Sequence, residues 1–367
     1  MSAGHVVVGL SGGVDSAVSA HLLQKAGYRV SGVFMVNWTA DEAGYCNAAE
    51  DFAAARSVAE ELEIPLERVD FSETYYEEVF RDFLAAYARG RTPNPDVLCN
   101  RAIKFAPFLA HARRLGADFV ATGHYARLEE ATDGGPRLYR GIDDDKDQSY
   151  FLAAVQREAF EGVRFPLGGL HKTEVRAIAR RLGLPNHQRK DSTGICFIGE
   201  RRMRDFLAQY LPARHGEIVD LSGRVLGEHP GVAFFTPGQR RGLALGGVAG
   251  AREAPWYVID RDIPANRLIV DQDPQHPRLM ARRIDLLAPH WIRRPEGAGT
   301  ETPLALDVRI RHRQRPQRAE LLVSSDGARL EFAEAQRAAA AGQYAVFYGA
   351  DGECYGCAEI EVAHPLG

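Results

Sequence analysis

No run of apolar residues in this 367-residue chain approaches the ~20 that a membrane-spanning helix needs. The first residues also lack the charged and apolar regions of a secretory signal peptide. Cysteine is scarce, at five in the whole chain, and we expect these thiols to be kept reduced rather than paired in structural disulfide bonds. These absences predict a cytoplasmic protein with no membrane partner.

Low-complexity sequence is also lacking, and the chain is 45% hydrophobic, which is ample for more than one packed domain. The net charge of −4 gives no sign of a nucleic-acid-binding protein. The average hides a local patch, because residues 278–318 carry ten arginines against four acidic residues. Such an excess of positive charge is typical of a surface that contacts phosphates.

The most informative segment is Ser-Gly-Gly-Val-Asp-Ser at residues 11–16, which follows an apolar run and precedes a helical pattern at 17–23. A strand, a glycine-rich turn and a helix start form a phosphate-binding loop in this order, because backbone N–H groups and the helix N-terminus point at the anion. The lysine of the kinase-type loop and the dinucleotide fingerprint are both missing. A plain serine- and glycine-rich turn is the less favoured alternative.

The first two hundred residues alternate strand and helix. Strands are expected at 30–36, 66–71 and 118–122, and helices at 48–62, 75–89, 104–115, 173–182 and 200–210. Such alternation predicts an α/β fold with a doubly wound parallel sheet. Ligands of these sheets bind beyond the carboxyl ends of the strands, which places Met35 and Gly123 on the same edge as the glycine-rich loop.

Turn signals become dense after Pro212, and strand patterns dominate from about Pro277, with one helix-like stretch at 333–341. We therefore expect three domains. Residues 1–210 form the α/β domain, 211–276 a small mixed linker domain, and 277–367 a β-barrel-like domain.

Cys99 and Cys196 both lie in turn-rich loops beside polar residues that could perturb a thiol. A single cysteine is usually a small buried hydrophobe, but in a chain that also carries a phosphate-binding loop this pair is the leading candidate for sulfur chemistry. Cys354 and Cys357 form one C-x-x-C pair with no second pair to complete a zinc site, and we interpret it as incidental. Cys46 is expected to pack near the nucleotide.

In these motifs the chain resembles the bacterial tRNA-specific 2-thiouridylase family, a branch of the PP-loop ATP pyrophosphatases. The resemblance covers all three regions in order, and its most specific blocks are Asn-Pro-Asp at 94–96 and Asp-Ser-Thr-Gly-Ile-Cys at 191–196. The remaining matching segments are residues 9–16, 90–93, 121–125, 146–151, 197–200 and 236–240.

The resemblance implies a reaction in which ATP adenylates O2 of a wobble uridine and sulfur then replaces that oxygen. It assigns the persulfide that delivers sulfur to Cys196, the attack that releases the thiolated base to Cys99, and general acid/base catalysis to Asp96, which could otherwise be a simple turn carboxylate. The nucleotide contacts that it implies are Gly9, Leu10, Ser11, Gly12, Gly13, Val14, Asp15, Ser16, Met35 and Gly123.

The tRNA contacts also follow from the resemblance. A wobble uridine can be turned out of an anticodon loop into such a site. The contacts are Asn94, Pro95, Asp96, His124, Lys146, Asp147, Gln148, Arg311, His312 and Gln343. The chain departs from the family at His312, where tyrosine is frequent. Arg309, Arg311, Arg313 and Arg315 are expected to supply phosphate contacts.

The implied cofactors and partners are ATP with Mg²⁺, tRNA, and a persulfide donor, either a sulfur-carrier protein or a cysteine desulfurase relay. An iron–sulfur cluster on Cys99, Cys196 and Asp96 is possible but not favoured. Three alternatives remain: an ATP-dependent amidating ligase, a thiol oxidoreductase or iron–sulfur enzyme, and a tRNA-binding protein without catalysis. The ligase would have no use for two loop cysteines.

Overall fold

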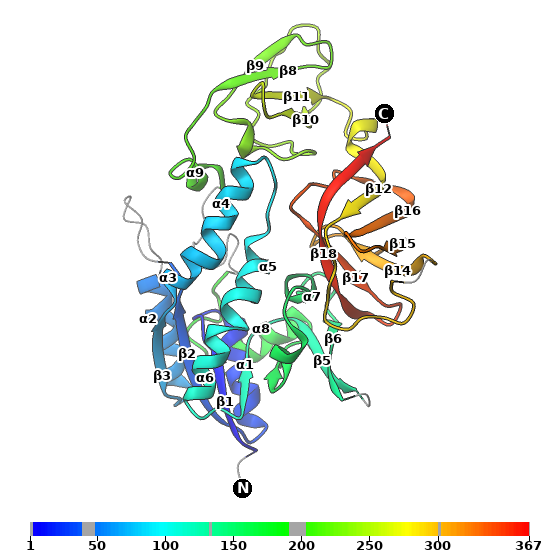
Figure 1. The fold of residues 1–367 in the computed structure, drawn as a ribbon. Coiled ribbons are helices and arrows are strands. Elements are labelled where there is room, and N and C mark those ends of the chain that lie inside the picture. The colour runs from blue at the N-terminus through cyan, green and yellow to red at the C-terminus, as the bar shows by residue number, and fades with distance from the viewer. Residues whose placement is uncertain (1–2, 39–47, 132–133, 191–202, 300–301, 367) are drawn as a thin grey trace.

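The structure is a computed structural model that describes residues 3–38, 48–131, 134–190, 203–299 and 302–366. Its first part is a five-stranded parallel sheet (Figure 1). The strand order is β3 (Leu66–Asp70), β2 (Arg29–Val36), β1 (His5–Gly9), β4 (Phe119–Ala121) and β7 (Val163–Arg164). The central strand β1 is buried over its whole length, as a sheet covered on both faces requires.

Helices cover both faces of this sheet. One face packs on α1 (Val14–Lys25), α2 (Ala48–Glu61) and α8 (Lys172–Arg181). The opposite face packs on α6 (Pro107–Arg114) and on the helical segments between residues 72 and 104. The predicted doubly wound α/β fold is thus confirmed.

Shorter helical elements connect and flank these layers. They are α3 (Ser72–Tyr75), η1 (Tyr76–Phe80), α4 (Arg81–Ala88), α5 (Pro95–Cys99), η2 (Asn100–Lys104), α7 (Ser149–Leu152), η3 (Arg157–Phe160), α9 (Met203–Leu207), η4 (Val232–Phe234) and η5 (Pro277–Leu279). In the parts of the chain that the structure describes, no helix is long and apolar enough to cross a membrane.

A separate four-stranded sheet forms the central part of the chain. Its order is β10 (Tyr257–Asp262), β11 (Arg267–Asp271), β8 (Gly216–Val219) and β9 (Val225–His229), and the β11–β8 pair is parallel. Its small core contains Ile218, Val258 and Leu268. In Figure 1 this sheet lies at the top of the molecule, beyond α4.

The C-terminal strands close into a six-stranded barrel. The pairing runs through β12 (Met280–Leu286), β16 (Ala328–Arg337), β15 (Gln317–Val323), β14 (Leu304–Arg309), β17 (Tyr344–Tyr348) and β18 (Glu353–Pro365). Closure comes from β12, which pairs with both β16 and β18. The predicted barrel-like architecture is confirmed.

Two findings differ from the sequence analysis. The expected helix at 333–341 is wrong, because β16 continues to Arg337 and pairs with β12 to that residue. The hairpin of β5 (Ala126–Ala131) and β6 (Gly135–Arg140) also joins the barrel sheet, since Leu138 of β6 pairs with Cys354 of β18. The short strand β13 (His290–Trp291) pairs with β18 as well.

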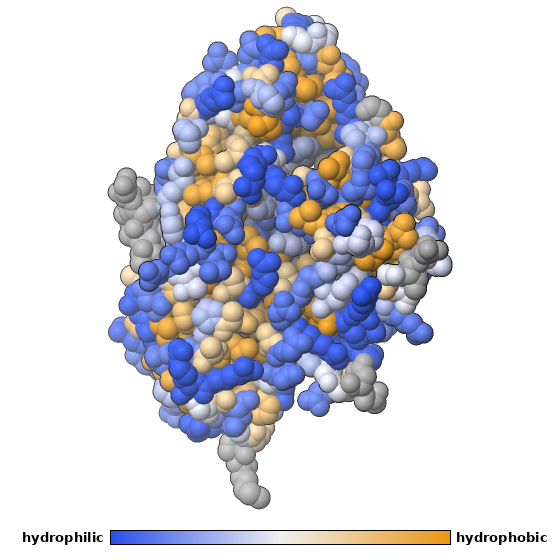
Figure 2. Space-filling model, in the orientation of Figure 1, coloured by the Kyte–Doolittle hydropathy of each residue, from blue (hydrophilic) through white to orange (hydrophobic). Residues whose placement is uncertain are grey.

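The surface is mixed. Figure 2 shows hydrophobic residues in small groups among hydrophilic ones over one face of the molecule. The interior, by contrast, contains a charged contact between the α/β part and the barrel. Arg309 at the end of β14 donates to the Asp147 carboxylate at 2.6 Å, and their side chains are 3% and 0% exposed.

The expectation that Arg309 contacts phosphate is therefore wrong for this structure. Its guanidinium is enclosed and paired with Asp147, and it lies 5.4 Å from the ring centre of Tyr348. Arginines alternate with other residues from 309 to 315. The first of them, Arg309, is buried, and Arg311, Arg313 and Arg315 are exposed.

This ion pair gives the first prediction. Arg309→Met should lower the free energy of unfolding by about 3–5 kcal/mol, because it leaves the buried Asp147 carboxylate without its main countercharge. Urea unfolding measures the loss. In the control, Arg267→Met removes the exposed pair with Glu217 on the central sheet and should cost less than about 1 kcal/mol. Equal losses in the two variants would contradict the assignment.

Candidate functional site: a phosphate cradle and a buried thiol

The glycine-rich loop at residues 10–13 joins the end of β1 to the start of α1. Ser16 fixes its shape, because Ser16 Oγ accepts from Ser11 N at 3.2 Å and donates to the Gly13 carbonyl at 3.1 Å. The first N–H groups of α1 have no partners within the helix. A twelve-residue helix that begins at the carboxyl edge of the sheet therefore offers these donors and its positive end to an anion.

Two glycines are required by close approach of the backbone. Gly12 has φ +77°, and a Cβ there would lie 2.7 Å from the Asp51 carbonyl oxygen and 2.9 Å from Ala55 N. A Cβ on Gly123 would lie 3.0 Å from Ser16 N. The segment after β4 is thus packed directly against the first turn of α1.

Asp15 in this first turn is held by two partners. Lys172 Nζ donates to both carboxylate oxygens, at 2.7 and 2.8 Å, and the Tyr125 hydroxyl donates at 2.8 Å. Lys172 is the first residue of α8 and is only 8% exposed. The sequence analysis did not identify Lys172, because 157 residues separate it from Asp15 and no local motif marks it.

The other flank of the loop is also held by polar side chains. Asn186 Nδ2 donates to the Gly12 carbonyl at 2.9 Å, and Arg189 donates to the same oxygen at 3.3 Å. Arg189 also pairs with Asp51 of α2. Lys172 and Arg189 thus lie on the two sides of the loop, each paired with a carboxylate, Asp15 and Asp51 respectively.

Cys99 ends a short helix built by its own sequence. Asn94 Oδ1 accepts from Asp96 N at 3.1 Å and from Val97 N at 3.2 Å, and Pro95 occupies the first turn. Asp96 is half-buried in that turn, and the chain continues from Cys99 into the π-helical segment η2.

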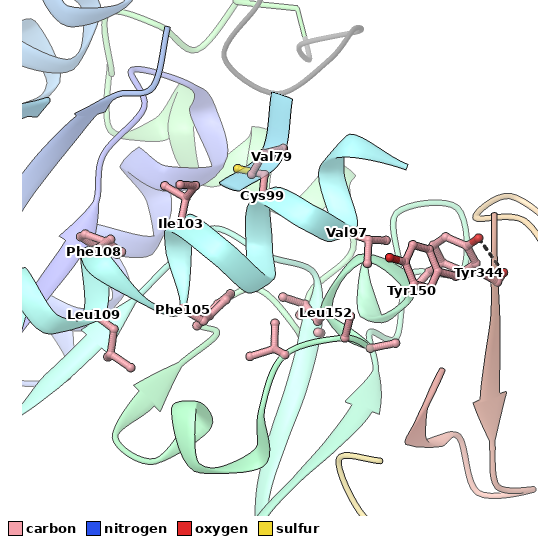
Figure 3. Close-up of a cluster of buried hydrophobic side chains, with 14 of the residues drawn as sticks. Val79, Val97, Cys99, Ile103, Phe105, Phe108, Leu109, Tyr150, Leu152 and Tyr344 are labelled. Atoms are coloured by element: carbon pink, nitrogen blue, oxygen red, sulfur yellow. Dashed lines mark hydrogen bonds between the residues drawn. The ribbon is translucent and has the colours of Figure 1, made fainter. Parts of the chain in front are cut away.

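The Cys99 thiol is buried in the hydrophobic cluster drawn in Figure 3, close to Val79 and Ile103. Burial raises its pKa to about 12, Lys104 acts in the opposite direction, and Asp96 adds to the increase. In this arrangement Cys99 is a protonated, enclosed thiol and therefore a poor nucleophile.

The other cysteines divide into two groups. Cys46 and Cys196 lie outside the described residues. Cys354 and Cys357 are buried free thiols of β18, and burial raises the pKa of each. Within the described ranges, no three or more His, Cys, Asp or Glu side chains are grouped to hold a metal ion.

Several of the predicted tRNA contacts use their polar atoms inside the protein. The Asp147 carboxylate also accepts from Gly141 N and Ser149 N, and Gln148 Oε1 accepts from Tyr125 N at 3.0 Å. His124 is 7% exposed, and its Nδ1 lies 2.7 Å from Thr122 Oγ1. Burial lowers the pKa of His124 well below its usual value.

The remaining predicted contacts lie where the barrel meets the α/β part. His312 Nε2 is 3.1 Å from the Asp147 carbonyl oxygen, and its ring lies 4.2 Å from that of Phe151. Arg311 is exposed and donates to the Arg337 carbonyl, while Gln343 Nε2 donates to the Thr92 carbonyl at 2.7 Å. The structure thus brings residues 146–148 together with 311–312, and Gln343 to the segment that precedes Asn94.

The cradle gives the second prediction. Gly12→Ala should abolish measurable ATP binding in a calorimetric titration, because the new methyl group collides with backbone atoms of α2. Gly27→Ala is the matched control, since Gly27 has φ +88° but nothing within 4 Å of its Cβ position. That control carries only the left-handed strain, of roughly 1–2 kcal/mol, and should bind ATP normally. Equal ATP affinity in both variants would rule out a cradle at Gly12.

Three family models match the chain in order: the tRNA methyl transferase HUP domain at residues 4–200, the tRNA methyl transferase PRC-barrel domain at 204–272, and the aminomethyltransferase beta-barrel domain at 281–360. Together they account for most of the sequence.

Curated relatives match along nearly the whole chain. The tRNA-specific 2-thiouridylase of Methylococcus capsulatus is 50% identical over 98% of this chain and 96% of its own length. That of Pseudomonas paraeruginosa is 49% identical over 98% of this chain and 94% of its own length. That of Stutzerimonas stutzeri is 49% identical over 98% and 95%. The chain therefore belongs to the tRNA-specific 2-thiouridylase family.

Proposed function

We propose that this protein uses ATP to replace O2 of the wobble uridine of tRNA with sulfur. The observation that carries the proposal is a phosphate cradle adjoining a cysteine-bearing helix in one domain. Gly123 packs on the first turn of α1, and the next residue, His124, lies 6.0 Å from the ring of Phe105. Phe105 N in turn donates to the Asn100 carbonyl, beside Cys99.

Adenylation is the first step because O2 of uridine is a poor leaving group. The uridine oxygen attacks the α-phosphorus of ATP, the bond to the β-phosphate oxygen breaks, and pyrophosphate leaves. The loop around Gly12, the first N–H groups of α1 and Lys172 hold the pyrophosphate portion and stabilise its charge. Asp15 holds Lys172 beside the loop, because Lys172 Nζ donates to both of its carboxylate oxygens. Mg²⁺ bound with ATP would neutralise the phosphates.

Sulfur transfer follows in two substitutions. A persulfide on Cys196 attacks C2 with its terminal sulfur, and AMP leaves with the former O2. The Cys99 thiolate then attacks Cys196 Sγ and breaks the sulfur–sulfur bond, so that the thiolated base departs with the terminal sulfur. The product is a Cys99–Cys196 disulfide, which a cellular thiol must reduce before the next turnover.

The uridine has to leave its stack to reach these groups. We assign Asn94, Pro95 and Asp96 to frame the flipped base, with Asp96 as the general acid/base. Lys146, Gln148 and the exposed Arg311 are proposed to bind the tRNA backbone around it. Phosphate contacts of this kind predict an affinity for tRNA that falls steeply with salt concentration.

Cys99 is fully enclosed in this arrangement, so its thiol has no access to a substrate, and burial also raises its pKa and disfavours the thiolate. The proposal therefore requires a local rearrangement around Cys99 when tRNA is bound, while Arg91 and Asn100 at the two ends of the segment stay held. That movement would bring the thiol out of the cluster of Val79 and Ile103 and toward the polar groups of the site.

The third prediction tests the function. Unmodified tRNA with a wobble uridine is incubated with the protein, Mg-ATP and a persulfide donor, and its nucleosides are measured by mass spectrometry. We expect 2-thiouridine and an equal amount of AMP from the unaltered protein. The Cys196→Ser variant should yield no 2-thiouridine. Cys354→Ser serves as the control and should retain activity.

Other outcomes would contradict parts of the proposal. AMP without 2-thiouridine would leave adenylation in place and overturn the assigned sulfur route. A methylated uridine would overturn sulfur transfer altogether. Visible absorbance of anaerobically purified protein would favour an iron–sulfur cluster over the persulfide.

A further inference from the structure

The segment 90–100, which contains Asn94, Asp96 and Cys99, is attached to the C-terminal barrel directly at its first end and through α7 at its second. We propose that the barrel is the support that fixes the Cys99 helix in place, with Arg91 and Asn100 as positioning residues at its two ends. The inference rests on the proposed function, because it assumes that Cys99 acts in sulfur transfer. It gives the barrel a role beyond binding tRNA.

The first attachment precedes α5. Arg91 donates to Glu359 Oε1 of β18 from Nε at 3.0 Å and from Nη2 at 2.7 Å, and Nη2 also donates to the Ile360 carbonyl. Both side chains are largely covered, at 25% and 32% exposure. This bidentate contact between Arg91 and a strand of the barrel fixes direction as well as distance.

The backbone next to Arg91 is held as closely. Thr92 N donates to the Ala341 carbonyl at 2.7 Å, and Gln343 Nε2 donates to the Thr92 carbonyl at 2.7 Å. Gly342 lies between these two contacts, and a Cβ there would be only 2.8 Å from Thr92 N. The turn before β17 is therefore in direct backbone contact with the segment, two residues before Asn94.

The second attachment lies just after Cys99. Asn100 is 1% exposed, and its Nδ2 donates to the Phe151 carbonyl of α7 at 3.2 Å. The helix α7 is itself fixed to the barrel, because the Tyr150 hydroxyl donates to the Tyr344 carbonyl at 2.9 Å and His312 packs on Phe151. Figure 3 shows Val97 of α5 beside Tyr150, which reaches toward Tyr344.

The attachments are not needed to complete the barrel. Its six strands close through their own ladder, in which β12 pairs with both β16 and β18. The contacts of Arg91 and Asn100 therefore act on the segment between them. A displacement of about 1 Å in a catalytic group can lower a rate about a hundredfold, so fixing both ends of α5 has a direct catalytic consequence.

The fourth prediction tests this role with Arg91→Met. Loss of the bidentate contact should loosen α5, so that the rate of Cys99 alkylation by iodoacetamide rises roughly tenfold, measured by mass spectrometry of the individual cysteine peptides. The alkylation rates of Cys354 and Cys357, which lie on β18 in the same buried cluster as Cys99, should rise far less than that of Cys99. The kcat for 2-thiouridine formation should fall roughly tenfold to a hundredfold, with the KM for tRNA within about twofold.

The controls separate positioning from general stability. Arg267→Met breaks an ion pair of the central sheet and should alter neither Cys99 alkylation nor kcat. Glu359→Gln keeps an acceptor for Arg91 and should give an intermediate effect, and it carries the test if Arg91→Met does not fold. Asn100→Ser should reproduce the Cys99-specific exposure from the other end.

Two results would overturn the inference. Equal acceleration at Cys99, Cys354 and Cys357 would mean that the whole protein has loosened. Unchanged Cys99 alkylation and unchanged kcat in Arg91→Met would mean that the barrel does not fix the segment. If the unaltered protein forms no 2-thiouridine, the proposed function fails, while the alkylation rates still decide whether the barrel holds α5.

Discussion

The enclosed carboxylate of Asp147 is the point on which the relation between the α/β part and the barrel depends. Arg309 and Arg140 pair with it, and Gly141 N, Ser149 N and Ser149 Oγ donate to it. A buried carboxylate is tolerated only when its oxygens are satisfied in this way. These donors come from both the α/β part and the barrel. The two parts must therefore pack against each other in the arrangement that brings all of the donors to Asp147. That arrangement fixes the position of α7. The Phe151 carbonyl of α7 then accepts a hydrogen bond from Asn100, the residue after Cys99.

Two separate sets of contacts support the two halves of the proposed chemistry. The phosphate cradle depends on the Asp15–Lys172 contact within the α/β part, whereas the cysteine helix depends on contacts with the barrel. Phe105 and His124 lie between them, so the nucleotide edge and the thiol belong to one continuous packed region. Covalent sulfur chemistry needs this proximity, since the uridine must be adenylated and attacked without leaving the site.

The sequence was informative where function is encoded locally. The predicted order of strand, glycine-rich loop and helix is confirmed at residues 5–25, and the strand–helix alternation predicted the parallel sheet. The sequence could not reveal Lys172, because its contact with Asp15 exists only after α8 packs beside α1. It misplaced Arg309 for a related reason. An arginine-rich run predicts an exposed charged face, but the end of β14 points one arginine inward to Asp147.

The pairing of β6 with β18 was equally invisible, since nothing in residues 126–140 marks a strand partner more than two hundred residues away. The prediction of a helix at 333–341 is wrong because pairing of β16 with β12 and β15 outweighs the local helix propensity of these residues. Cys99 was expected in a turn-rich loop, but it ends the helix α5. Its enclosure depends on η1 and η2, which only the folded chain brings together.

The proposed sulfur transfer requires Cys99 to break the sulfur–sulfur bond of the Cys196 persulfide in each turnover. The most direct measurement is a single turnover without reductant, followed by mass spectrometry of disulfide-linked peptides. We expect a Cys99–Cys196 disulfide in an amount that matches the 2-thiouridine formed. 2-Thiouridine produced while both cysteines remain free thiols would contradict it.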